Sequence, residues 1–197
     1  MTKEKIMEES LILFANYGYE NTTLTNIADA VGIKKPSLYN HFNNKEAIFL
    51  HVLNEVATKE KDYWTAYSEA ASTLSIADQL HHIYRVYLDH MANSTEGLFF
   101  KRVTLFPPEE FAGEIKEAFW LIEDCMTNII RQVLEQGIDQ KIIRPLSTDT
   151  LTSAFYTLVD GLFLEENFYD QDVFEQRQQA SWEIFWLGIR APKDKEE

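Results

Sequence analysis

The chain has 197 residues, 45% of them hydrophobic and 13% aromatic, with only 7 Gly and 5 Pro, which excludes a disordered or fibrous protein. The single cysteine excludes an internal disulfide, and no uninterrupted apolar run reaches the roughly 18 residues of a membrane-spanning helix. The net charge of −14 opposes nucleic-acid binding, but residues 1–50 hold five Lys against six Asp and Glu, so almost all of the excess lies later.

The first residues and the cysteine usage indicate where the protein works. Glu8 and Glu9 stand where a signal peptide needs its apolar core, so we expect no secretion signal. Cys125 stands alone, and no Cys and His residues have the spacing of a zinc site, which fits a reducing compartment. We therefore expect a cytoplasmic protein without a metal or other cofactor. Because Cys125 falls between the apolar positions Ile122 and Met126, we expect a buried, inert thiol.

Helical periodicity runs through the chain from end to end. Ile6, Phe14 and Ala15 share one face of a first helix, which Gly18 is expected to end. A second long helix is predicted from about residue 45 into the sixties. Further apolar stripes at helical spacing predict helices over 76–91, 115–133, 147–166 and 171–190.

The residues between these stripes indicate where the helices begin and end. Gly137 is expected to end the helix over 115–133, and Ser147 is expected to cap the one that follows. The pair Pro107-Pro108 interrupts helix near the middle of the chain, because proline lacks an amide proton. No Asn-Gly or Asp-Gly turn separates alternating apolar runs, so strands are not expected. The sequence predicts an all-α fold.

Residues 23–42 have the pattern of a helix-turn-helix. Thr23 can cap a short first helix, and Ala28 is small enough to let a second helix approach closely. Gly32 permits a left-handed backbone at the turn, and Ile33 fills the space between the helices. The first helix turns three apolar residues inward: Ile27, Ala28 and Val31. In the second helix Pro36 suits the first turn, and the residues four apart that face the core are Leu38 and Phe42.

The second helix leaves a polar and aromatic set facing outward, namely Lys35, Ser37, Tyr39, Asn40 and His41. Lysine and hydroxyl groups can donate to phosphates, and an asparagine can read base edges. Residues 30–45 hold three Lys and no Asp or Glu, so the locally basic stretch coincides with the motif. A helical hairpin with a merely solvated surface is the alternative, and this combination favours DNA binding over it.

This part of the chain resembles the TetR family of bacterial regulators. The matching residues are Phe14, Ala15, Gly18, Tyr19, Thr22 and Thr23, then Ile27, Ala28, Val31 and Gly32, then Ser37, Leu38, Tyr39, His41, Phe42, Lys45 and Glu46. The resemblance covers about the first 50 residues. It implies a three-helix DNA-binding domain over residues 1–46 and a helical domain over 47–197 that binds a small-molecule effector. By position, it places at the DNA Thr25, Lys35, Pro36, Ser37, Tyr39, Asn40, His41 and Lys45.

The resemblance also implies a homodimer, formed through the helices over 147–166 and 171–190, and usually repression. Such a dimer would bind a palindromic DNA operator, with its recognition helices about 34–36 Å apart. Gly161 inside the first of these helices costs about 1 kcal/mol relative to alanine, which a close helix crossing could offset. The alternative is that both helices merely close the core of one monomer.

Aromatic residues are dense after residue 60, and several could line an effector pocket: Tyr63, Tyr67, Tyr84, Tyr87, Phe100, Phe119 and Phe155. For any single one, a place in the core is the simpler interpretation. A cationic effector would need a counter-charge from among Asp89, Glu123, Asp160, Glu165 and Glu166, although solvated acidic residues are the preferred interpretation. His81, His82 and His90 indicate no metal site, because His82 and His90 are about two helical turns apart.

Two other classes of function stay open. An all-α enzyme would need a nucleophile with a positioned base, a metal set or a phosphate loop, and none is visible. A protein-interaction module could use the same helical hairpin to dock another protein. The salt dependence of duplex binding separates both classes from a regulator.

Overall fold

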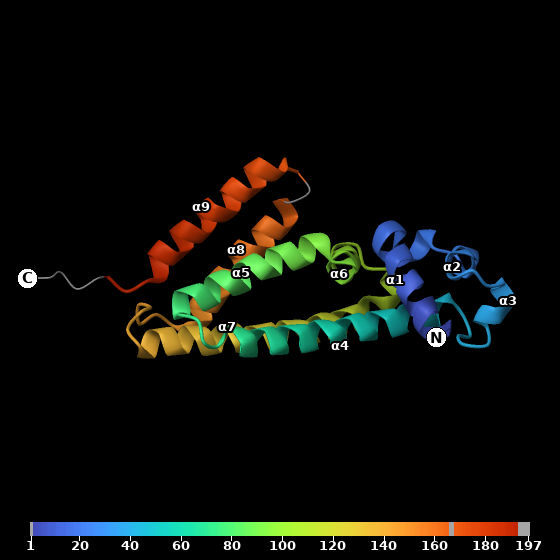
Figure 1. Ribbon diagram of the computed structural model, residues 1–197, viewed down its shortest axis with the longest axis horizontal. Helices are drawn as coiled ribbons and strands as arrows, with labels where there is room; N and C mark the ends of the chain where they lie inside the picture. Colours follow the sequence, from blue (N-terminus) through green and yellow to red (C-terminus); the bar gives the residue numbers. More distant parts are fainter. Residues whose placement is uncertain (1, 166–167, 193–197) are drawn as a thin grey trace, which may run out of the picture. The chain divides into compact units, whose positions relative to one another are not determined.

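The computed structural model describes residues 2–165 and 168–192. Helices form every regular element of that part, and its β pairing is limited to an isolated bridge between Ile143 and Arg190 (Figure 1). The predicted all-α class is thus confirmed. The elements are α1 (Thr2–Asn21), α2 (Leu24–Val31), α3 (Lys35–Leu38), α4 (Lys45–Ala71), α5 (Ile76–Asn93), α6 (Thr95–Leu105), the 3-10 helix η1 (Glu109–Phe111), α7 (Ala112–Asp139), α8 (Thr148–Glu165) and α9 (Gln171–Ile189). Among the described residues, no helix is both long and apolar enough to span a bilayer.

The helices are divided between two compact units. One comprises the residues up to Trp64 together with Asn93–Asp124, and the other comprises Thr65–Ala92 together with the residues from Cys125 onward. α4 and α7 contribute to both units. In packing terms, α1, α2 and α3 therefore share a unit with α6 and with parts of α4 and α7. The functional division into residues 1–46 and 47–197 stays a prediction.

Aromatic rings form the centre of the first unit. Phe14, Phe49, Phe99 and Phe111 are almost completely buried. The ring of Phe49 stands edge-on to Phe14 at 5.4 Å, is stacked on Phe111 at 4.8 Å, and lies 5.9 Å from Phe99. Aromatic pairs attract one another at these centroid distances. Because the four rings come from α1, α4, α6 and η1, this cluster fixes the helices on which the helix-turn-helix rests.

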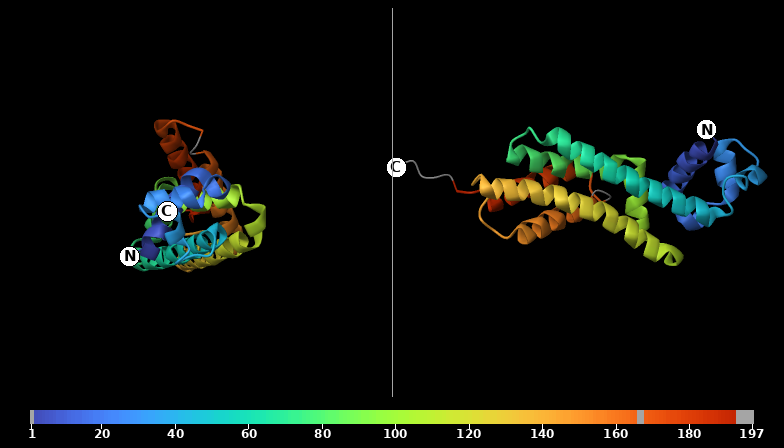
Figure 2. Two further views of the ribbon diagram at one scale, coloured as in Figure 1. Left: turned by 90° about the vertical axis from the view of Figure 1, so that its right-hand side faces the viewer. Right: turned by 90° about the horizontal axis from the view of Figure 1, so that it is seen from below.

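The second unit is held together around α5, α8 and α9. Tyr84 of α5 is fully buried, and its hydroxyl donates a hydrogen bond of 2.7 Å to the carbonyl of Gln178 in α9. The segment after α7 is joined to the end of α9, because the Arg144 amide donates to the Ile189 carbonyl at 2.8 Å. α8 and α9 pack side by side and run in opposite directions (Figures 1 and 2).

Two glycines expected to end helices behave differently. Gly18 interrupts α1 with a φ of +80°, which residues with a Cβ rarely adopt, so the predicted break there is confirmed and a short further turn completes α1. The prediction that Gly137 ends a helix is wrong. α7 continues through Gly137 to Asp139, and the chain turns at Lys141, whose φ is +58°.

Gly137 is needed for space rather than for backbone freedom. A Cβ at this position would lie 2.5 Å from Cδ1 of Ile143 and 2.9 Å from Cγ2 of Ile76. Both distances are shorter than any ordinary carbon–carbon contact. The glycine therefore lets the segment after α7 and the start of α5 pack directly against the backbone of α7.

The structure adds one helix to those predicted and corrects one further expectation. α6 was not expected as a helix, because Leu98, Phe99 and Phe100 are consecutive and show no clear helical stripe. The expected buried thiol is wrong, since Cys125 is half-buried and its Sγ lies 3.7 Å from Oγ1 of Thr65. Cys125 follows the exposed Asp124 and so lies at the edge of the apolar face of α7 rather than in its centre.

Replacing Gly137 with alanine should destabilise the protein, because the added methyl group overpacks the contact with Ile143 and Ile76. We expect the free energy of unfolding to fall by about 1–3 kcal/mol, measured by urea denaturation. Gly113→Ala in the first turn of α7 is the matched control, since a Cβ there would meet nothing within 4 Å. Equal stability of the two variants would contradict the packing role of Gly137.

Candidate DNA-binding interface

α2 begins with a reciprocal capping arrangement. Thr23 has an extended backbone, and its Oγ1 accepts a hydrogen bond of 3.2 Å from the amide of Asn26. The Asn26 side-chain oxygen in turn accepts from the Thr23 amide at 2.9 Å. Both amides belong to the helix N-terminus, where no backbone acceptor is available. The predicted cap at Thr23 is confirmed, and the inward face of α2 is buried as expected: Ile27, Ala28 and Val31.

The turn after α2 is fixed by hydrogen bonds on both sides. Gly32 has a φ of +80° and a ψ of +32°, the left-handed conformation predicted for it. The amides of Gly32 and Ile33 both donate to the carbonyl of Ala28, at 3.0 Å and 2.9 Å. From α1, the Lys5 ammonium donates to the carbonyl of Val31 at 2.9 Å. The turn therefore needs no DNA to hold its shape.

α3 is a single helical turn that depends on the side chains it buries. Pro36 lies in its first turn, as predicted, and Lys34 at its N-cap provides no side-chain cap. Leu38 and Phe42 are 1% and 4% exposed, which confirms that both face the core. The Phe42 amide donates to the Leu38 carbonyl at 2.9 Å, so the helical path continues beyond the last residue of α3. A helix this short is not stable alone, and burial of these two residues holds it.

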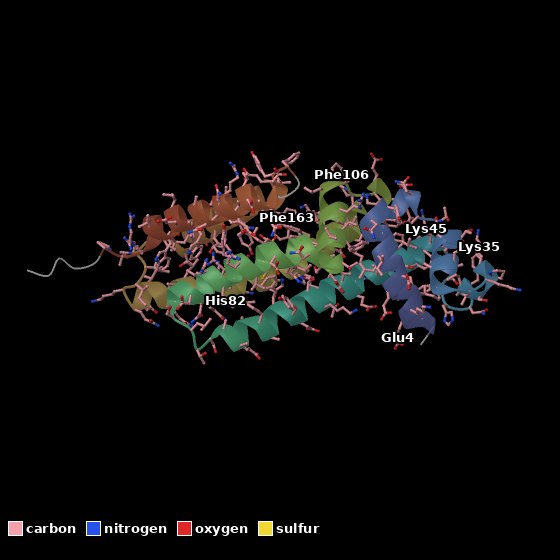
Figure 3. All side chains as sticks on the ribbon, turned by 45° about the horizontal axis from the view of Figure 1, so that its top comes forward. Glu4, Lys35, Lys45, His82, Phe106 and Phe163 are labelled. Atoms are coloured by element: carbon pink, nitrogen blue, oxygen red, sulfur yellow. The ribbon has the colours of Figure 1, made fainter. Side chains whose placement is uncertain are left out.

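The outward face of this turn carries most of the residues predicted to meet DNA. Tyr39 is 52% exposed, and Thr25, Lys35, Pro36, Asn40 and His41 are exposed as well. Ser37 is half-buried, so its hydroxyl lies closer to the protein than expected. Figure 3 shows Lys35 pointing away from the helices around it. All of these except Thr25, which lies in α2, are presented together on α3 and the turn that follows it, and their contact with DNA stays a prediction.

Lys34 is a further candidate that the sequence analysis counted in the basic stretch but did not place at the DNA. Its side chain is exposed, directly before Lys35 and Pro36. Within the described residues neither Lys34 nor Lys35 forms an ion pair or a side-chain hydrogen bond, so both charges are available to phosphates. The lysine pair next to a helix-starting proline is the sequence signal that could have identified it.

Lys45 has a different environment from the other candidates. It is half-buried, its Nζ donates a hydrogen bond of 2.7 Å to the carbonyl of Tyr19, and the same atom lies 3.8 Å from the centre of the Tyr19 ring. Burial and the neighbouring Glu110 carboxylate raise the pKa of the Tyr19 hydroxyl, which stays protonated and donates to Glu110. Lys45 therefore joins the start of α4 to the end of α1. Its contact with the DNA backbone stays a prediction.

α6 reaches α1 through Arg102, which the sequence analysis did not single out. The Arg102 Nε donates to the carbonyl of Ala15 at 2.8 Å, and its Nη2 donates to the carbonyl of Asn16 at 3.0 Å. Its Cδ lies 3.6 Å from where a Cβ on Gly18 would stand. Both partners are more than 80 residues away in the sequence, so no local pattern announces this contact. These hydrogen bonds join α6 directly to α1, the helix that precedes the helix-turn-helix.

The residues predicted to line an effector pocket are distributed over both units. Tyr63, Phe100 and Phe119 belong to the first unit, and Tyr67, Tyr84, Tyr87 and Phe155 belong to the second. Phe100 and Phe119 lie parallel at 6.3 Å, and Tyr67 is stacked on His82 at 5.9 Å. Phe100, Tyr84 and Phe155 are buried as core residues, although Tyr84 also borders a groove between α5 and α9. A single pocket lined by all of them stays a prediction.

The candidate counter-charges differ in their surroundings. Glu165 forms an ion pair with Arg177, which lowers the pKa of the Glu165 carboxyl. Asp89 and Asp160 are exposed, and Glu123 is half-buried. Glu166 lies outside the described residues. Partial burial raises the pKa of the Asp160 carboxyl. The interpretation of these acids as surface charges stays a prediction.

Comparison with known proteins gives this arrangement a context. Residues 6–52 match the pattern of the bacterial regulatory proteins of the tetR family. Over 195 residues, the chain is 49% identical to the biofilm operon icaADBC HTH-type negative transcriptional regulator IcaR of Staphylococcus aureus (strain Newman), covering 94% of this chain and 96% of that protein. The IcaR of Staphylococcus epidermidis is 49% identical over 47 residues, 24% of this chain and 25% of that protein.

Solved structures share the fold at lower identity. A transcriptional regulator of the TetR family from Cytophaga hutchinsonii has a TM-score of 0.75 and 21% identity, covering 98% of this chain and 96% of that chain. The transcriptional regulator FadR from Bacillus subtilis, solved with stearoyl-CoA, has a TM-score of 0.68 and 17% identity, covering 94% and 98%. At these identities, the two structures support the fold.

Replacing Lys45 with alanine should lower the free energy of unfolding more than replacing Lys34, because Lys45 holds two helices together and Lys34 is exposed. Lys45→Ala removes a charged hydrogen bond and a cation–ring contact, so we expect the free energy of unfolding to fall by about 1–3 kcal/mol. Lys34→Ala removes an exposed charge and should stay within about 0.5 kcal/mol of the parent. Thermal and urea unfolding of both variants give the comparison. Equal stability of the two variants would show that the contact of Lys45 with Tyr19 contributes little.

Proposed function

Because the chain belongs to the TetR family of bacterial regulatory proteins, we propose that it is a ligand-responsive, homodimeric repressor that binds a palindromic DNA operator through residues 23–42. The observation that supports this most is that the second helix of the motif buries one set of side chains and exposes another. Leu38 and Phe42 are buried, while the residues between and before them present cations, hydroxyls, an amide and rings to the outside. Operator binding places the protein in the cytoplasm, with the chromosome.

Within the interface we assign two kinds of contact. Lys34, Lys35 and Tyr39 donate to phosphates and position the protein without reading sequence. Asn40 is the side chain best suited to read a base edge, since an asparagine can pair in bidentate fashion with adenine. His41 and Thr25 lie at the edges of the same face. Lys45 acts mainly by holding α4 against α1, so that the exposed turn is presented at a fixed angle.

The dimer contact is proposed on α8 and α9. Leu164, Val173 and Ile184 are 46%, 42% and 70% exposed, which is unusual for aliphatic side chains on neighbouring helices. Gly161 of α8 meets nothing within 4 Å at its Cβ position, so another helix has room to approach its backbone. A shallow groove between α8 and α9 contains Ala154, Leu158 and Ala180. A twofold pairing of this surface would bury the apolar residues and offset the cost of Gly161.

The response to an effector requires a path to the DNA-binding helices. Arg102 of α6 holds the carbonyls of Ala15 and Asn16 in α1, so any displacement of α6 is transmitted to α1. An effector can lower operator affinity only if it binds the DNA-competent and DNA-incompetent states unequally. We propose that it does so from the helical part of the chain over 47–197. The predicted lining residues belong to both units, so they do not define the pocket that receives the effector.

The relatives support a proposal about the kind of gene under control. The Staphylococcus aureus protein, 49% identical over nearly its whole length, carries the name of a negative regulator of a biofilm operon. We extend negative regulation to this chain, and the DNA upstream of an operon of that type is the first operator to test. An all-α enzyme or a protein-docking module would not show the salt response described next.

Duplex binding should fall steeply as salt rises, because each phosphate contact releases a condensed counterion. Lys35→Ala should reduce the slope of log affinity against log salt by about one, and Lys35→Ala with Tyr39→Ala should abolish specific binding. Asn40→Ala should change the preferred operator sequence. Fluorescence anisotropy with labelled duplexes at several salt concentrations measures all three. Lys116→Ala, which removes an exposed lysine outside the motif, is the matched control. Duplex binding that does not depend on salt would contradict the regulator proposal.

Ile184→Glu should convert the protein to a monomer, because a carboxylate would be buried against an apolar partner surface. Sedimentation equilibrium or light scattering should show the mass halved, and operator affinity should fall with it. Leu105→Glu, at a residue of α6 that is 42% exposed, is the control and should leave the dimer intact. If Ile184→Glu remained dimeric, the pairing would have to lie on another surface.

A further inference from the structure

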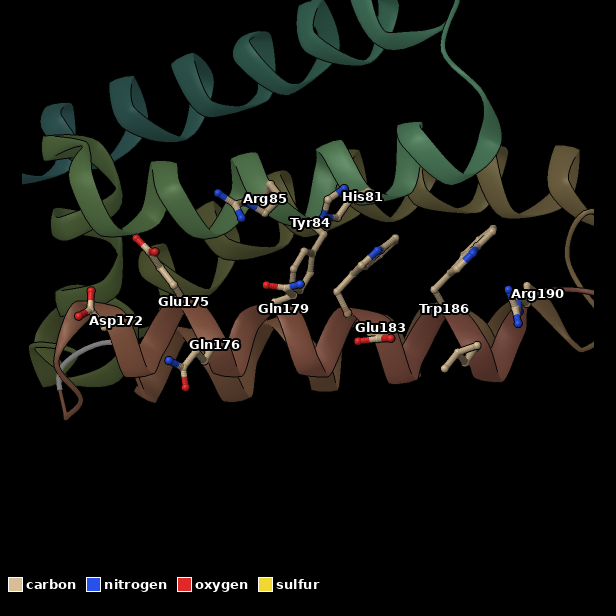
Figure 4. A pocket seen from close by; sticks show the side chains of 12 residues that line it. His81, Tyr84, Arg85, Asp172, Glu175, Gln176, Gln179, Glu183, Trp186 and Arg190 are labelled. Atoms are coloured by element: carbon tan, nitrogen blue, oxygen red, sulfur yellow. The ribbon is translucent and has the colours of Figure 1, made fainter.

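A groove with a volume of about 790 Å³ runs between α5 and α9, entirely within the second unit (Figure 4). We refer to it as the α5–α9 groove. Its aromatic wall comprises His81, Tyr84, Trp182 and Trp186, and its charged residues comprise Arg85, Asp172, Glu175, Glu183 and Arg190. Of these, only Tyr84 was predicted from the sequence to line a pocket, and no role was predicted for Trp182 or Trp186.

The aromatic wall is an ordered stack. The ring of Trp182 lies 4.8 Å from His81 at an interplanar angle of 29°, and 6.2 Å from Trp186 at 9°. Tyr84 adds a fourth ring, 5.2 Å from Trp182, and its hydroxyl is held by the Gln178 carbonyl. Trp182 and Trp186 are only half-buried, so part of each ring remains accessible. Near-parallel, partly exposed rings form a surface that suits a flat ligand.

The charges are placed unevenly along this wall. Glu183 lines the groove, directly follows Trp182 in α9 and is exposed (Figure 4). Within the described residues, the Glu183 carboxylate has no ion-pair or hydrogen-bond partner. Arg85 lies on one side of Glu183 along the groove and Arg190 lies on the other (Figure 4). The part of the groove beside Glu183 is therefore one where a positive charge is favoured.

His81 adds no positive charge to the wall at neutral pH. Partial burial of the ring is the main cause that lowers the pKa of the His81 imidazole. The positive Arg85 and the neighbouring His82 lower this pKa further, and Asp78 opposes them with a smaller effect. On the α9 side the ring meets the uncharged Trp182. The imidazole therefore stacks as a neutral ring.

We propose that the α5–α9 groove binds a planar aromatic cation, stacked on Trp182 and Trp186 with its positive charge beside Glu183. An indole face attracts cations more strongly than any other side-chain ring, and the adjacent carboxylate adds to that attraction. The groove stays accessible in the dimer proposed above, because Trp182 and Ile184 are two residues apart on α9 and point in nearly opposite directions. This inference deepens the ligand-responsive part of the proposed function, on which it rests, by naming a site and a class of ligand.

The test uses the full-length chain and three probes that differ in charge: 1-methylquinolinium, neutral quinoline and quinoline-2-carboxylate. Titration calorimetry should show saturable binding of the cation, about three- to thirtyfold tighter than quinoline, with the anion weakest. The chain has 4 Trp, so a nitrogen-15 spectrum resolves their indole signals individually. The cation should move the signals of Trp182 and Trp186 and leave those of Trp64 and Trp120 in place.

Two variants locate the charge and the ring. Glu183→Gln should weaken the cation several-fold and leave quinoline unchanged, and Glu135→Gln, an exposed glutamate on α7, should change neither. Trp182→Leu should weaken both probes; its unfolding temperature is checked because Trp182 also packs on Tyr84. Equal affinities for the cation and quinoline, identical behaviour of Glu183→Gln and Glu135→Gln, or shifts at Trp64 or Trp120 instead would each overturn the proposal. Operator binding measured separately keeps this outcome distinct from that of the regulator proposal.

Discussion

The end of α1 is the constraint on which the first unit depends. At Gly18 the backbone leaves the helical conformation, so the carbonyls of the preceding turn lose their helical partners. Arg102 supplies donors to Ala15 and Asn16, and Lys45 supplies one to Tyr19 just beyond the bend. Cations at a helix C-terminus also interact favourably with its dipole. Two distant segments, α6 and the start of α4, are thereby positioned by the same short stretch of backbone.

The same chemistry explains how an acidic chain can present a small basic surface. Lys5 and Lys45 are two of the five lysines in residues 1–50, but each donates to a backbone carbonyl inside the unit. Lys34 and Lys35 are exposed instead. Counting lysines therefore overstates the positive charge available to a phosphate backbone, and the hydrogen bonds decide which lysines remain for it. Long-range attraction to DNA should accordingly be modest, with more of the recognition left to close contact.

Features that depend on neighbouring residues could be predicted from the sequence, and features that depend on distant ones could not. Thr23, Gly32, Pro36, Leu38 and Phe42 were assigned correctly because caps, left-handed turns and helical spacing are local properties. Gly137 was misread because its role is set by Ile143 and Ile76, which approach it only in the folded chain. Arg102 and the tryptophans of the α5–α9 groove gave no local signal for the same reason.

The short α3 has a consequence for how such proteins diversify. The side chains that keep its turn in place, Leu38 and Phe42, are different from the ones that face outward, such as Lys35, Tyr39 and Asn40. Exchange of an outward residue changes no buried contact and so leaves folding stability nearly untouched. New operator preferences can therefore arise by single substitutions on an unchanged scaffold. Duplicated copies of the gene can diverge in their DNA targets while they keep the same fold.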